Sequence, residues 1–64
     1  MECIALYSER YGYFKSMYDN RTHHTHDSRE AAKYIHLDVA LRIRDYLESE
    51  YDEDYNIELI TEEG

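Results

Sequence analysis

The stretch that decides the fold is HLDVALRIRDYLESEY, residues 36–51. At the 100° per residue of an α-helix, its apolar side chains recur with a period of 3.6 and gather on one side. That side carries Val39, Ala40, Ile43, Tyr46, Leu47 and Tyr51, with Leu37 at its edge. The opposite side carries Asp38, Arg42, Asp45 and Ser49. The pattern predicts an amphipathic helix that begins near Leu37, frays near Tyr51 and buries one stripe against the rest of the chain.

Two short apolar runs precede this helix and predict an antiparallel hairpin. The runs are ECIALYS (2–8) and YFKSMY (13–18), and Gly12 between them can adopt the positive φ of a tight connection. Because side chains alternate along a strand, we expect Ile4 and Leu6 on the face that packs against the helix.

The remaining segments predict a loop, a short turn and a last strand. DNRTHHTHDS (19–28) is polar and opens with a turn-prone pair, so we expect an exposed loop. Ser28 is expected to cap a short helical turn that begins at Arg29, although the same residues, REAAKY, could instead add a brief strand. YNIELIT (55–61) alternates and predicts a strand that joins the hairpin.

These elements predict an α+β fold, in which a small antiparallel sheet of β-hairpin plus C-terminal strand packs on one main amphipathic helix. A chain of 64 residues buries only about 60% of its unfolded surface, so we expect one small domain, 1–64. Cys3 is the only cysteine and is expected to be a small buried hydrophobe. No apolar run follows Met1, so we expect no secretory signal, no membrane contact and a cytoplasmic location.

The net charge of −8 is unevenly distributed. Residues 1–44 hold 7 basic and 6 acidic side chains, whereas residues 45–64 hold 9 acidic side chains and no Lys or Arg. Such an anionic end repels phosphate backbones and attracts basic surfaces. It can also serve only to keep the chain soluble.

Tyrosine is the second unusual feature, with eight residues against a single Phe14 and no tryptophan. A tyrosine ring combines apolar area with a hydroxyl that needs a partner, which suits surfaces that are sometimes covered. We expect Tyr46 and Tyr55 to be half-buried in the core. About half of the tyrosines are expected to be structural, which leaves several for a contact surface.

No catalytic or metal-binding pattern emerges. His23, His24 and His26 are neighbours in a polar stretch, where side chains point apart instead of converging on a metal, so a solvated segment is expected. No serine lies in a nucleophile elbow, and no carboxylate has a neighbourhood that would raise its pKa. We expect neither an enzyme nor a bound cofactor.

Direct nucleic-acid binding is also disfavoured. Basic residues lie among aromatic ones in the first half of the chain, as in a surface on which bases stack. They are Arg10, Lys15, Arg21, Arg29 and Lys33. The opposing carboxylates nearly cancel their charge, so an isolated nucleic-acid binder is not expected.

The layout resembles small phage and prophage proteins of Gram-positive bacteria. The resemblance rests on the hairpin IALYSERYGYFKSMY, on EAAKYIHLDVALRIRDYLESEY and on the short acidic strand that follows. It implies a compact hairpin–helix–strand unit, and a setting in which tiny proteins bind and disable a host enzyme. No functional residue follows from it.

Together these features predict an inhibitor that binds the basic, nucleic-acid-binding surface of a host bacterial protein by mimicking nucleic acid. The predicted partner-binding residues are Asp45, Tyr46, Glu48, Glu50, Tyr51, Asp52, Glu53, Asp54, Tyr55 and Glu58, within an acidic end that continues to Glu63. The alternative is a structural or adaptor protein whose Tyr-rich hairpin forms a homodimer or binds a partner.

Overall fold

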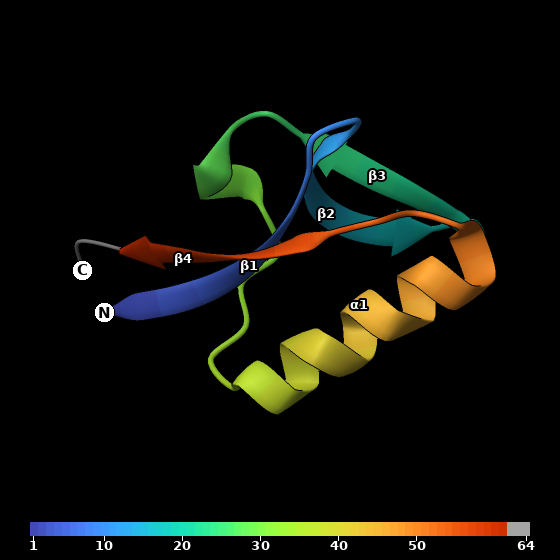
Figure 1. Ribbon diagram of the computed structural model, residues 1–64. Helices are drawn as coiled ribbons and strands as arrows, with labels where there is room; N and C mark the ends of the chain where they lie inside the picture. The colour runs from blue at the N-terminus through green and yellow to red at the C-terminus, as the bar shows by residue number, and fades with distance from the viewer. Residues whose placement is uncertain (62–64) are drawn as a thin grey trace.

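Figure 1 shows the computed structural model, which describes residues 1–61. The elements in chain order are β1 (Glu2–Ser8), β2 (Gly12–Tyr18), β3 (Arg21–Thr25), the 3₁₀-helix η1 (Ser28–Glu30), α1 (Leu37–Tyr51) and β4 (Asn56–Thr61). The four strands form one antiparallel sheet in the order β3-β2-β1-β4. Helix α1 packs on one side of β1, and η1 lies on the other side in this view (Figure 1). The predicted α+β fold is confirmed, with one strand more than expected.

Strand β1 is central because it is apolar on both faces. It pairs with β4 along its length, from Glu2 opposite Thr61 to Tyr7 opposite Asn56. Ala5 and its neighbour Leu6 are both fully buried although they point to opposite faces. Cys3, on the same strand, is buried as expected.

The turn between β1 and β2 depends on a glycine. Gly12 has a φ of +91°, and a Cβ atom there would lie 2.8 Å from the carbonyl oxygen of Thr25. Ser8 stabilises the same turn, because its Oγ accepts hydrogen bonds of 3.2 Å from the backbone N–H groups of both Arg10 and Tyr11. The predicted hairpin connection is therefore confirmed.

Beyond this turn, β1 and β2 are joined through a third segment. Their direct register covers two residue pairs next to the turn. Farther along, Ile4 and Tyr34 exchange backbone hydrogen bonds of 2.7 and 2.8 Å, and the N–H of Ala32 donates to the carbonyl of Phe14 at 2.9 Å. Residues 32–34 thus link β1 to β2. They form an isolated bridge at Tyr34, and not the brief strand that was the alternative for REAAKY.

The prediction of a loop over residues 19–28 is wrong for residues 21–25, which form β3. Asp19 and Asn20 have φ of 55° and 58°, and they form a two-residue turn of the kind that joins antiparallel strands tightly. Strand β3 then pairs with β2. A polar sequence is tolerated because β3 lies at the edge of the sheet.

The helix bounds agree with the periodicity. Helix α1 covers Leu37–Tyr51 and ends at Asp52, which has a left-handed conformation and donates its N–H to the carbonyl of Glu48. The short turn at η1 is capped by Asp27 instead of Ser28, because the Asp27 carboxylate accepts the N–H of Arg29 at 2.9 Å. No helix in residues 1–61 is both long and apolar enough to cross a membrane.

The core lies between α1 and the sheet. The buried cluster consists of Ile4, Leu6, Phe14, Ala40, Leu47 and Tyr55. Ile4 and Leu6 therefore face the helix as predicted. Of the predicted helical stripe, Ala40 and Leu47 are fully buried, whereas Val39 and Tyr46 are exposed by 39% and 47%. The expectation that Tyr46 belongs to the core is wrong, because α1 contacts the sheet along a narrower stripe than the periodicity suggested.

Leu47 provides a direct test of this packing. We expect Leu47→Ala to lower the free energy of unfolding by about 2–5 kcal/mol, since a fully buried leucine leaves a cavity when it is truncated. Leu37→Ala, at a position that is 52% exposed on the same helix, should cost less than about 1 kcal/mol. Urea unfolding followed by circular dichroism measures both, and equal losses would contradict the packing described here.

Candidate functional site

The ten residues predicted to bind a partner do not form one surface. Three of them, Asp45, Glu48 and Asp52, are exposed and line a shallow depression together with Ser49. Their spacing of three and four residues places them on one side of α1, where Glu48 is about 90° and Asp45 about 150° around the helix from the buried Ala40–Leu47 stripe. We call Asp45, Glu48 and Asp52 the acidic ridge.

The ridge lies where negative charge does not help the helix. The C-terminal end of an α-helix carries the negative pole of its dipole and favours cations, yet the last turn of α1 contains no basic residue. Glu50 and Asp54 add exposed carboxylates at the same end. Arg44 pairs with Asp45 at 3.5 Å. Because this placement does not serve helix stability, it favours a role in attracting a cationic surface.

Two tyrosines lie on the same part of α1. The rings of Tyr46 and Tyr51 are 6.2 Å apart in an edge-to-face arrangement. Tyr46 is 47% exposed, while the hydroxyl of Tyr51 donates to the sulfur of Met17 on β2 at 3.6 Å. Tyr46 is therefore accessible, and Tyr51 is held against the sheet beside it.

Glu53 and Tyr55 are buried, so they are not part of the predicted contact surface. They are only 9% and 6% exposed. The hydroxyl of Tyr55 donates to Oε1 of Glu53 at 2.8 Å, and the hydroxyl of Thr22 donates to Oε2 at 2.7 Å. The segment after α1 is thus joined to β3 through a buried carboxylate.

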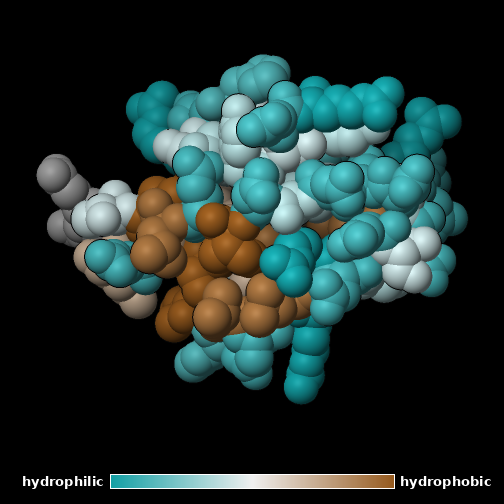
Figure 2. All heavy atoms as spheres, in the orientation of Figure 1, coloured by the Kyte–Doolittle hydropathy of each residue, from teal (hydrophilic) through white to brown (hydrophobic). Residues whose placement is uncertain are grey.

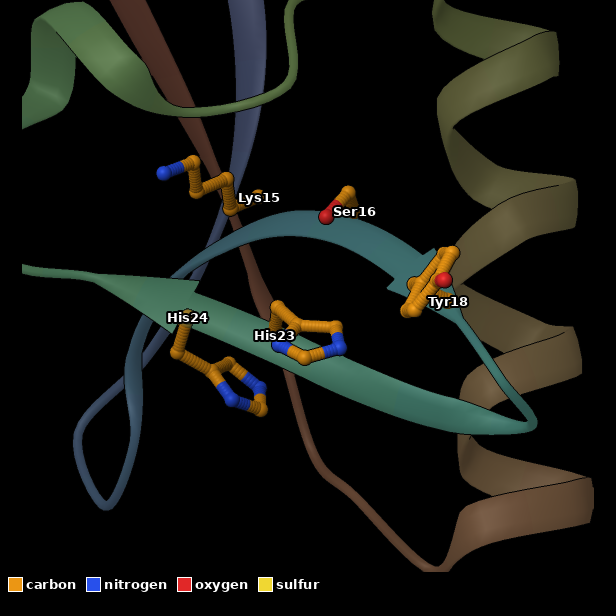
Figure 3. Close-up of a pocket in the computed structure, with 5 residues that line it drawn as sticks. All are labelled: Lys15, Ser16, Tyr18, His23 and His24. Carbon is orange, nitrogen blue, oxygen red and sulfur yellow. The ribbon is translucent and has the colours of Figure 1, made fainter.

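His24 completes this buried network. Its Nε2 lies 2.5 Å from the hydroxyl oxygen of Tyr55 and 3.9 Å from Oε1 of Glu53. Since the Tyr55 hydroxyl donates its hydrogen bond to Glu53, the hydroxyl oxygen can accept a hydrogen bond from the Nε2–H of His24. The imidazole also stacks on the ring of Tyr11, at 5.0 Å, and lies nearly parallel to the ring of Tyr55, with the ring centres 6.0 Å apart. Figure 3 shows His24 projecting from β3.

Burial shifts the pKa values of His24 and Tyr55 in opposite directions, and both shifts favour the neutral form of the side chain. It lowers the pKa of His24 below 6.5, with the carboxylate of Glu53 acting against the shift and His23 adding to it. Burial also raises the pKa of Tyr55, and its hydrogen bond to Glu53 adds to that rise. The hydrogen bond to Glu53 requires a protonated phenol, and the lowered pKa of His24 favours a neutral imidazole.

Glu58 lies in a third place, away from both the ridge and the network. It is partly buried on β4, opposite Ala5 of β1. The pKa of Tyr13 is raised by burial and by the neighbouring Glu58 carboxylate. Glu58 is therefore separated from the ridge, and Glu62 and Glu63 lie outside the described residues.

The histidines of β3 do not converge. His24 points to the core, whereas His23 contacts the exposed ring of Tyr18 at 6.3 Å. Both line an open depression with Lys15, Ser16 and Tyr18 (Figure 3). Within the described part of the chain, no three His, Cys, Asp or Glu side chains are grouped so as to hold a metal ion.

The inward role of β3 was missed at the sequence level. A two-residue Asp19–Asn20 turn between two chain segments is a hairpin signal when both residues tolerate positive φ. Within β3, the side chains of Thr22 and His24 point inward, where Thr22 contacts Glu53 and His24 contacts Tyr55. The residues between and beside them point outward. The turn and the alternation together could have indicated a strand in place of a loop.

Tyr55 tests whether the network stabilises the fold. We expect Tyr55→Phe to lower the free energy of unfolding by about 1–3 kcal/mol, because Glu53 and His24 each lose a buried hydrogen-bond partner. Tyr18→Phe removes the same hydroxyl from a side chain that is 75% exposed and should change stability little. Denaturant titrations of the two variants make the comparison, and a neutral Tyr55→Phe substitution would contradict the network.

His24 makes a pH-dependent contribution of predictable sign. Because its folded pKa lies below 6.5, the unfolded state binds more protons as the solution is acidified. Its contribution is present above pH 6.5 and is lost as the pH falls through the folded pKa. We expect the stability of His24→Gln to fall less steeply than that of the unmodified chain between about pH 7 and 5. A slope in His24→Gln equal to that of the unmodified chain would refute the assignment.

Comparisons of the chain with protein-family models, curated proteins and solved structures gave no match. The function is therefore inferred from the charge and geometry of the chain itself. The resemblance in layout to small phage proteins stays a prediction.

Proposed function

We propose that the chain is a non-enzymatic inhibitor that covers the basic, nucleic-acid-binding surface of another protein with its acidic ridge. The observation that carries this proposal is the outward alignment of Asp45, Glu48 and Asp52 along one depression. At 1.5 Å of rise per residue, the three carboxylates extend over about 10 Å, or one charge about every 5 Å. One strand of duplex DNA carries a charge about every 3.4 Å, so the linear densities are of the same order.

Aromatic side chains supply the second part of the contact. Tyr46 is exposed on the same half of α1 as the ridge, next to Asp45 in the chain, and its ring contacts that of Tyr51. Charged side chains accelerate the encounter with an oppositely charged surface, whereas a buried aromatic anchor slows dissociation. Tyr46 is the ring that we assign to this anchoring role.

The proposed partner is a host bacterial protein that handles DNA or RNA in the cytoplasm. Its binding surface carries Lys and Arg side chains arranged for phosphates, and the ridge occupies that surface. The layout resemblance to phage proteins supports an inhibitory purpose. The chain itself does not bind nucleic acid in this proposal, because its anionic end repels phosphates.

The contacts of the hairpin tyrosines favour the ridge over the adaptor alternative. Tyr7 and Tyr13 pack edge to face at 4.9 Å, and Tyr11 stacks on His24. These rings already have partners within the chain, so they offer less area to another molecule. Tyr18 is the hairpin ring with a large exposed fraction, 75%.

The ridge is tested by neutralising its charges. We expect the triple substitution Asp45→Asn, Glu48→Gln and Asp52→Asn to abolish capture of the partner from a Gram-positive bacterial lysate. The unmodified chain should retain a DNA- or RNA-handling protein that elutes at high salt, since ionic contacts between exposed groups are screened. Asparagine tolerates the left-handed conformation of residue 52, so the fold should be kept.

A matched control separates the ridge from overall charge. Glu2→Gln, Glu9→Gln and Asp38→Asn change the net charge by the same amount at exposed positions away from the C-terminal end of α1. This control should capture the same protein as the unmodified chain. Equal capture by both triple variants, or a captured protein that resists high salt, would contradict the proposal.

A further inference from the structure

Strand β4 has one unpaired side. It lies at an end of the sheet order, and within residues 1–61 its strand partner is β1. The outer N–H and C=O groups of such an edge are a template for pairing with another strand. β4 contains no proline or lysine that would block this pairing, and its sequence NIELIT favours extended structure.

Apolar side chains are exposed at the same end of the molecule. Leu59 of β4 is 66% exposed, although it lies opposite the buried Ile4 and on the same face of the sheet. Ile35 and Leu37, at the start of α1, are exposed by 63% and 52%. Figure 2 shows apolar surface gathered over β4 and the N-terminal half of α1. A continuous patch of this kind usually marks an interaction surface.

The charge distribution allows a second copy of the chain to cover this surface. Asp45 is the ridge residue nearest to the patch, and it lies eight residues, or about 12 Å along α1, from Leu37. Exposed charges are largely screened beyond about 8–10 Å in physiological salt. A second copy of this acidic chain can therefore approach the patch without strong repulsion from the ridge.

We propose that two copies of the chain associate through β4, antiparallel to each other, about a two-fold axis at Leu59. In this register Leu59 lies opposite Leu59 of the second copy, and Glu58 lies opposite Ile60. An axis at Glu58 would instead place two carboxylates directly opposite each other, which is unfavourable. The pairing is self-complementary, as a two-fold interface requires, and it joins the two sheets into one.

The proposed dimer keeps the acidic ridges of its two copies apart. Asp54 lies five residues from the axis, or about 17 Å at the rise of an antiparallel strand, and the two copies extend in opposite directions. The two Asp54 residues are then about 34 Å apart. A biological interface needs about 500 Å² from each copy, which is about a tenth of the accessible surface of 4786 Å². Leu59, Ile35 and Leu37 are the exposed apolar side chains that would contribute to that area.

Cross-linking tests the register. Residues directly opposite each other on antiparallel strands have Cα atoms about 4.5–5.5 Å apart, within the range of a disulfide. We expect Leu59→Cys to form a covalent dimer under mild oxidation of the purified chain. Asn56→Cys should not, because the same register places it about 20 Å from its counterpart. The unmodified chain controls for the buried Cys3. Equal cross-linking of both variants, or none in Leu59→Cys, would overturn the register.

Sedimentation equilibrium tests the association itself. We expect the unmodified chain to form dimers, and Leu59→Lys to raise the dissociation constant by about tenfold or more, because a charge replaces apolar area at the axis. Tyr18→Lys alters a side chain that is 75% exposed outside the patch and should leave the dimer intact. A monomer at millimolar concentration, or a dimer that Leu59→Lys does not weaken, would overturn the proposal. Circular dichroism of each variant confirms that it folds.

Discussion

The packing of α1 on the sheet is the contact on which the rest of the structure depends. Ala40 and Leu47 are fully buried against the cluster that contains Ile4 and Leu6. Two contacts, seven residues apart on one helix, fix the rotation of that helix about its own axis. This rotation turns Asp45, Glu48 and Asp52 outward together, so the acidic ridge is a direct consequence of how the core is packed.

The buried network then fixes the chain that leaves the helix. Glu53 follows Asp52 directly, yet its carboxylate points inward and is held by Thr22 and Tyr55. Among the acidic residues 52–54, Glu53 thus stabilises the fold, whereas its neighbours Asp52 and Asp54 are exposed to solvent. Removing the charge of Glu53 therefore affects stability, whereas removing that of Asp52 leaves the core untouched.

Local patterns predicted the parts of this structure that depend on local contacts. The period of 3.6 gave the bounds of α1, Gly12 indicated the first turn, and the alternation in β1 identified Ile4 and Leu6 as core residues. The position of Glu53 depends on hydrogen bonds between residues 31 apart in the sequence, from β3 to the segment before β4. No periodicity within either segment reveals such a contact. The acidic cluster therefore appeared as one surface, although its members lie in three different places.

In the proposed function, the acidic ridge and nucleic acid compete for one basic surface. The most direct measurement is the fluorescence anisotropy of a labelled DNA or RNA duplex bound to the captured partner, while the chain is added at constant salt. We expect the label to be released completely, at a stoichiometry of one ridge for each binding surface. A duplex that stays bound while the chain also binds the partner would show that the ridge does not occupy the nucleic-acid site, and would contradict the account.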